Sequence, residues 1–119
     1  MKLEKNLEKV LETAGLNYEK ILELSYEVFN IFAGLNDLDE SRMFEFSDAG
    51  GVPIFCFDGT EDELLDMEMS DDYTIVVEEL DTGAIRYVMV YDIQLFDWPI
   101  EITCFYIELK SELKEAGLL

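Results

Sequence analysis

The stretch from Met43 to Ile85 decides the fold of this chain: MFEFSDAGGVPIFCFDGTEDELLDMEMSDDYTIVVEELDTGAI. It contains thirteen carboxylates and no lysine, arginine or histidine. A block of one charge sign is typical of a disordered tail, but these acids alternate with large apolar residues such as Phe55, Leu64 and Ile75. Because that apolar material can be buried, we expect the stretch to fold and to carry its charge on its surface. Folding against such repulsion costs stability, so we look for a function that would explain the charge.

The composition describes a single, strongly acidic domain over residues 1–119. Half of the residues are apolar, which excludes a disordered chain. The balance of 28 acids against 8 bases gives a formal net charge of −20, whereas small domains typically carry a magnitude of about 2–8. An excess of this size repels nucleic acid and anionic membranes. It attracts basic surfaces such as those of nucleic-acid-binding proteins.

Two helices are predicted before the acidic stretch. Apolar residues recur with the helical period over residues 2–14 and again after Asn17, which is a good N-cap. Gly15 and Gly34 are the expected helix ends. The short link between the two segments predicts an antiparallel helical hairpin.

The rest of the chain is predicted to consist mainly of strands. Pro53 lacks a ladder donor, which favours an edge strand or a strand start. Gly83 in Asp81-Thr82-Gly83 suits a three-residue hairpin loop, and Asp97-Trp98-Pro99 suits a further turn. The predicted strands are Met43–Ser47, Val52–Phe57, Asp72–Leu80, Ala84–Phe96 and Ile100–Leu109.

Two short helices complete the predicted fold. Thr60 and Glu63 form a capping box, which predicts a helix from about Glu61 to Met69, and another helix is expected after Ser111. The order of these elements predicts an α+β fold. We expect the N-terminal helical hairpin to pack on an antiparallel β-meander, with a short acidic helix and a short C-terminal helix.

Catalytic and metal-binding motifs are not found, so we expect a protein that is not an enzyme and uses no cofactor. Without histidine there is no Ser–His or Cys–His pair. Gly50-Gly51 lacks the lysine and the helix of a phosphate-binding loop. An EF-hand counted from Asp58 would need Gly at its sixth position and Glu at its twelfth, where Glu63 and Met69 stand.

Several other residues have simple structural interpretations. Cys56 and Cys104 lie in apolar runs and are expected to be reduced core thiols. The aromatic residues could stack nucleic-acid bases, but Arg86 is the only cation between Met43 and Leu109, which favours a core role and no direct nucleic-acid binding. The N-terminus has no apolar signal region and no run is long enough to span a membrane, so we expect a cytoplasmic protein.

The acidic stretch itself is the main candidate for function. Acids at i and i+4 on a helix lie about 5–6 Å apart, and acids at i and i+2 on a strand about 6.8 Å apart. Rows of carboxylates at such spacings can imitate the phosphates of a nucleic-acid backbone and enter a groove built for them. The densest charge predicts the partner-binding residues, which are Asp58, Glu61, Asp62, Glu63, Asp66, Glu68, Asp71 and Asp72.

A short C-terminal word suggests the kind of target. Leu109-Lys110-Ser111-Glu112-Leu113 resembles the ending of some small, acidic, phage-encoded type II-A anti-CRISPR proteins. The resemblance implies an α+β domain that occupies the DNA-binding groove of an RNA-guided nuclease. This chain differs in continuing for five residues past Lys114, and no contact residues carry over from that family.

Two alternatives stay open from the sequence. An immunity protein or antitoxin would use the same acidic face to cover the basic active site of a nuclease toxin. Alternatively, the charge could serve solubility alone, as acidic helix faces often do. The sequence predicts no oligomeric state.

Overall fold

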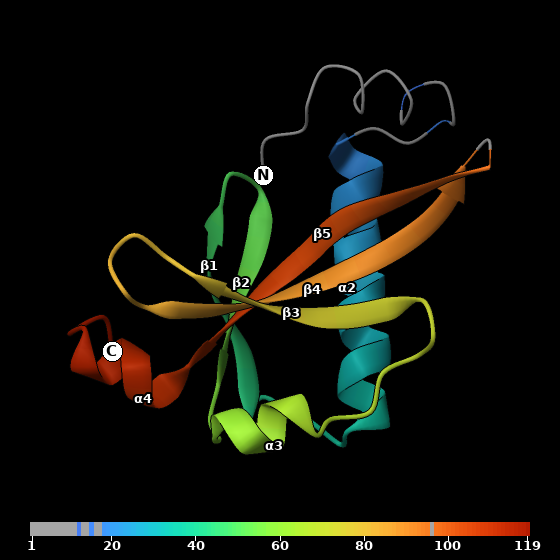
Figure 1. Ribbon diagram of the computed structural model, residues 1–119. Helices are drawn as coiled ribbons and strands as arrows, with labels where there is room; N and C mark the ends of the chain where they lie inside the picture. Colours follow the sequence, from blue (N-terminus) through green and yellow to red (C-terminus); the bar gives the residue numbers. More distant parts are fainter. Residues whose placement is uncertain (1–11, 13–14, 16–17, 96) are drawn as a thin grey trace.

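A computed structural model describes residues 12, 15, 18–95 and 97–119 of the chain (Figure 1). Most of the predicted helix over residues 2–14 lies outside these residues, so the N-terminal helical hairpin stays a prediction. The described elements are α2 (Tyr18–Leu35), β1 (Met43–Ala49), β2 (Val52–Phe57), α3 (Glu61–Leu65), β3 (Tyr73–Glu79), β4 (Ile85–Leu95), β5 (Trp98–Leu109) and α4 (Lys110–Glu115).

The five strands form one mixed sheet in the order β1-β2-β5-β4-β3. Neighbouring strands are antiparallel except for β2 and β5, which are parallel. The α+β class is therefore confirmed, but the purely antiparallel meander is wrong. After β2 the chain forms α3 and then the β3–β4 hairpin. The last strand, β5, lies between β2 and β4. A parallel pair requires a long connection of this kind, and α3, β3 and β4 supply it.

β2 is an inner strand, so the edge-strand interpretation of Pro53 is wrong while the strand-start interpretation holds. Pro53 is the second residue of β2, and pairing with β5 begins one residue later, at Ile54 opposite Tyr106. The missing donor therefore faces no partner strand on that side. All six residues of β2 are buried, as expected for a strand covered on both faces.

The tight turns follow from local sequence. Gly50 and Gly51 have φ of 65° and 90° and form the two-residue link between β1 and β2. The Gly83 amide donates to the Leu80 carbonyl at 2.8 Å, and the Leu80 amide donates to the Ala84 carbonyl at 2.9 Å. Gly83 has φ of 86°, so the predicted three-residue loop is confirmed.

Element ends differ from prediction by a few residues. α2 runs through Gly34 to Leu35, and α3 ends at Leu65 instead of Met69. Trp98 already belongs to β5, so the last turn is tighter than predicted, and Asp97 has φ of 59°. α4 begins directly at Lys110.

α2 covers one face of the sheet, and the core lies between them (Figure 1). The Phe29 ring stacks on the Phe55 ring with centroids 3.8 Å apart and meets Phe105 edge-on at 5.7 Å. Val28 and Phe32 of α2 are almost fully buried beside them. Such aromatic packing contributes about 0.5–1.5 kcal/mol per pair beyond burial.

Cys56 and Cys104 are fully buried and form no disulfide, which confirms their prediction as core thiols. Burial raises the pKa of both thiols, that of Cys104 to about 12. Thiols in this state are poor nucleophiles, because the reactive species is the thiolate.

Candidate functional site: the α3 acidic surface

We use the name α3 acidic surface for the eight carboxylates predicted as partner-binding: Asp58, Glu61, Asp62, Glu63, Asp66, Glu68, Asp71 and Asp72. All eight are exposed to solvent. They lie on α3, on the link from β2 that precedes it and on the link to β3 that follows it. α3 is at the end of the molecule where α2 ends (Figure 1).

α3 is short, and its N-terminus explains why it forms at all. Thr60 is the N-cap in extended conformation, and its hydroxyl accepts from the Glu63 amide at 3.2 Å while the Glu63 carboxylate accepts from the Thr60 amide at 3.4 Å. The predicted capping box is therefore confirmed. Acids in the first turn are also favoured by the helix dipole. Leu64 is fully buried in the core and anchors the helix to the sheet.

Arg42 anchors the start of the surface. Its Nε donates to the Asp58 carbonyl at 3.0 Å, and its Nη2 donates to the Glu63 carboxylate at 2.8 Å. The guanidinium carbon also lies 5.4 Å from the centroid of the Phe57 ring. One arginine therefore fixes both the backbone that enters α3 and a side chain of its first turn.

Asn36 anchors the end of the surface. Its Nδ2 donates to the Glu68 carbonyl at 2.9 Å, and its Oδ1 accepts from the Glu68 amide at 2.8 Å. The same Nδ2 donates to the Phe32 carbonyl at 2.9 Å, near the end of α2. The segment after α3 is thus tied to the helix that covers the sheet.

Glu61 connects the surface to the core. The buried Tyr87 hydroxyl donates to its carboxylate. Burial and this hydrogen bond raise the pKa of Tyr87 well above its usual value, so it remains a neutral donor. Anchors of this kind hold the acidic backbone in one conformation, which lowers the entropy lost when a partner binds.

Two members of the surface are neutralised by bases from outside the acidic stretch. Lys110 lies 3.5 Å from the Asp58 carboxylate, and Arg42 lies 2.8 Å from Glu63. Although the stretch from Met43 to Ile85 contains no base of its own, these two acids are therefore paired by bases outside it. Within the described part of the chain, no base forms an ion pair with the remaining acids, which are Glu61, Asp62, Asp66, Glu68, Asp71 and Asp72.

The structure adds two carboxylates that the sequence interpretation missed. Asp92 and Glu101 are directly opposite each other in the β4–β5 ladder, and the Asp92 amide donates to the Asp72 carbonyl at 2.9 Å. The three acids therefore form a row across neighbouring strands, which lie about 4.8 Å apart. Like charges placed opposite each other cost stability. The predicted turn at Asp97-Trp98-Pro99 would have placed Asp92 opposite Cys104, so the pair with Glu101 could not be found from the sequence.

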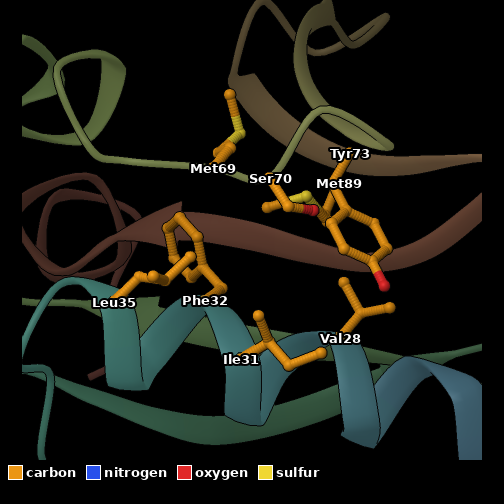
Figure 2. Close-up of a pocket in the computed structure, with 8 residues that line it drawn as sticks. All are labelled: Val28, Ile31, Phe32, Leu35, Met69, Ser70, Tyr73 and Met89. Carbon is orange, nitrogen blue, oxygen red and sulfur yellow. The ribbon is translucent and has the colours of Figure 1, made fainter.

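A small hollow lies apart from most of these charges, between α2 and the chain from Met69 to Tyr73, with Met89 of β4 also in its wall (Figure 2). Its volume is about 10 Å³, which is close to the space that one water molecule needs. Its walls are apolar except for the Tyr73 and Ser70 hydroxyls. The Ser70 Oγ is buried and has no hydrogen-bond partner among the described residues. The described residues that line the hollow include no acid, no base and no nucleophile paired with a base.

Within the described ranges, no three histidine, cysteine, aspartate or glutamate side chains are arranged to hold a metal ion. In the same part of the chain, no helix is both long and apolar enough to cross a membrane. No protein-family model, curated protein or solved structure matches this chain.

Proposed function

We propose that this protein is a non-catalytic inhibitor that presents the α3 acidic surface to the basic DNA-binding groove of a nuclease. One observation carries the proposal. All thirteen carboxylates between Met43 and Ile85 are exposed, and described bases form ion pairs with only Asp58 and Glu63 among them. A surface evolved for solubility alone has no need to concentrate unpaired charge on one anchored segment.

Spacing and rigidity support the same proposal. Asp62 on α3 and Asp66 at its C-cap are about one helical turn apart, a separation of about 5–6 Å between side chains. Arg42 and Asn36 fix the backbone at the two ends of this segment. A fixed row of charges suits a groove that normally binds a stiff line of phosphates, and its binding should release the anions held there.

The resemblance of the C-terminal word suggests an RNA-guided nuclease as the target. In the fold, residues 109–113 support the α3 acidic surface and do not belong to it. Leu109 and Leu113 are buried, and Lys110 contacts the Asp58 carboxylate. Its residues position one end of the α3 acidic surface, and the carboxylates themselves make the proposed contact.

Competition for DNA is the direct test. A catalytically inactive type II-A nuclease loaded with its guide is mixed with fluorescent target DNA, and displacement of the DNA by the protein is followed by anisotropy. We expect displacement that weakens steeply as salt rises, because exposed charges are screened over about 8–10 Å near physiological ionic strength. Simultaneous binding of DNA and protein, or salt-insensitive binding, would refute groove occupation. Displacement seen only from a guide-independent basic nuclease would instead support the immunity alternative.

A further inference from the structure

β3 forms one edge of the sheet, and half of its backbone groups face outward. The ladder from β3 to β4 is continuous from Tyr73 opposite Tyr91 to Glu79 opposite Ile85. Two hydrogen bonds show which residues on this side of the hairpin bond to β4. The Asp92 amide donates to the Asp72 carbonyl, and the Leu80 amide donates to the Ala84 carbonyl.

Bonding positions alternate along an antiparallel strand. The even-numbered positions of β3 therefore bond to β4, while the amides and carbonyls of Ile75, Val77 and Glu79 point to the outer edge. Within the described residues, none of these outward groups has another backbone partner. At Tyr73 the edge is closed, because its amide donates to the Ser70 carbonyl at 3.1 Å.

The other edge of the sheet is protected where β3 is not. β1 carries an irregularity between Glu45 and Ser47 that shifts its register, and such bulges discourage the addition of a further strand. β3 has an unbroken register and contains no proline or lysine. Among the described residues, the protection that β3 has is negative charge, which repels some partners and attracts others.

The side chains along this edge indicate the chemistry of a segment that could bind there. Val76 and Val77 are about half exposed, at 48% and 50%, on opposite faces of the strand. Glu78, Glu79 and Asp81 follow them, and all three are exposed. The nearby Arg86 does not neutralise them, because its guanidinium pairs with Glu108 at 2.9 Å.

We propose that the outer edge of β3 binds an extended, basic segment of a protein partner, which adds to the sheet as a sixth strand. Main-chain bonds to Ile75, Val77 and Glu79 supply the affinity, as in other strand additions. β-branched residues of the segment contact the two valines, and its lysines or arginines meet the acids at the ends.

A second copy of this chain is a poor occupant. Antiparallel pairing of two β3 strands about Val77 would place Asp81 of one copy opposite Tyr73 of the other, one residue from its Asp72. Each copy also carries a net charge of −20. Both effects oppose self-association.

The test uses a labelled synthetic peptide, Lys-Arg-Thr-Val-Thr-Val-Thr-Arg-Lys, and the full-length protein. We expect the peptide to protect the amides of Ile75, Val77 and Glu79 from hydrogen exchange by about tenfold or more. The amides of Thr74, Val76 and Glu78 are already bonded to β4 and should change little. Two peptide isomers carry N-methyl groups on alternate residues. The isomer methylated on its inward amides should lose binding, and the other should keep it.

Equal binding of the two isomers, or no selective protection along β3, would overturn the proposal and leave only ionic adsorption. Val77→Pro provides the matching change in the protein, because it removes an outward amide and leaves the ladder to β4 intact. It should lower peptide affinity about tenfold or more. The isomer comparison needs no protein variant, so misfolding of Val77→Pro cannot obscure the result. DNA displacement is measured separately: its failure with intact peptide binding would reject the proposed function and leave the β3 edge standing.

Discussion

The Asn36 side chain and the Glu68 backbone form two reciprocal hydrogen bonds, of 2.9 Å and 2.8 Å, that tie the end of α2 to the segment after α3. Asn36→Asp keeps the size of the side chain but replaces its donor with an acceptor. The Phe32 and Glu68 carbonyls would then face a carboxylate oxygen, so we expect a loss of about 1–3 kcal/mol in unfolding free energy. Chemical denaturation measures this loss, and hydrogen exchange at the Glu68 amide should become faster.

Asn30→Asp is the matched control for this change. Asn30 is exposed on α2, which ends one residue before Asn36, so the variant adds the same charge without breaking a described hydrogen bond. If the two variants lose equal stability, the added charge is responsible and Asn36 has no special anchoring role.

Ser70 offers an opposite prediction, in which removal of a polar group increases stability. Its Oγ is buried without a partner among the described residues, and such a group costs about 1–3 kcal/mol. Ser70→Ala should therefore raise the melting temperature. The buried Ser25 hydroxyl donates to the Ile21 carbonyl at 2.9 Å, so Ser25→Ala should change stability by less, about 0.5 kcal/mol. A destabilised Ser70→Ala would show that the hydroxyl is satisfied in solution.

Gly59 should tolerate no side chain, because the Phe57 ring occupies the space. A Cβ at this position would lie 2.4 Å and 2.5 Å from two ring carbons of Phe57, which is fully buried. Gly59→Ala should cost about 1–3 kcal/mol through overpacking. In Gly34→Ala the new Cβ meets no atom within 4 Å, so helix propensity should stabilise the protein by up to about 1 kcal/mol. Thermal unfolding of the Gly59→Ala and Gly34→Ala variants measures both effects. Similar changes in stability at the two sites would contradict the clash with Phe57.

Replacement of Glu112 by Gln should change the stability of the protein by an amount that depends on pH. Burial, followed by the nearby Glu108, Glu61 and Glu115 carboxylates, raises the pKa of Glu112 in the folded protein. A carboxyl with a raised folded pKa destabilises the fold where it is charged, and this penalty fades as pH falls through that pKa. Glu112→Gln should therefore be more stable than the wild type at neutral pH, with the difference shrinking toward acid pH. Glu115→Gln, an exposed change on the same helix, should show a smaller difference.

Local features of this fold could be predicted from the sequence, and non-local ones could not. The capping box of Thr60, the hairpin loop ending at Gly83 and the range Val52–Phe57 all follow from neighbouring residues. The parallel pairing of β2 with β5 joins segments separated by α3 and a complete hairpin, so no local pattern encodes it. One available signal favoured it: a continuous apolar run such as Val52–Phe57 is typical of an inner strand.

The candidate site was predictable in its charges but not in its anchors. Exposure of the acids follows from their density and from the few apolar residues among them. Arg42 precedes the acidic stretch by one residue, and Lys110 lies far along the chain, so a count within the stretch missed both ion pairs. Asn36 gave no signal, because its role depends on the distance between α2 and the segment after α3.

The last prediction separates a docked surface from a simple charge effect. One variant changes three unpaired members of the α3 acidic surface, Asp62, Asp66 and Glu68, to Asn or Gln. The other changes Glu12, Glu19 and Glu23 to Gln. Each variant removes three exposed negative charges, so an effect of net charge alone would weaken partner binding equally.

A docked surface should respond very differently to the two variants. Charges that lose their water in a groove cost about 2–5 kcal/mol when removed, whereas charges at a rim mainly change the association rate. We therefore expect a large rise in Kd and a smaller salt dependence for the first variant only, measured by displacement of DNA from the nuclease. Equal losses would reduce the effect to net charge. Glu12, Glu19 and Glu23 belong to α2 and the residues before it. A larger loss in the second variant would therefore place the contact near the N-terminal part of the chain and refute the α3 acidic surface as the binding site.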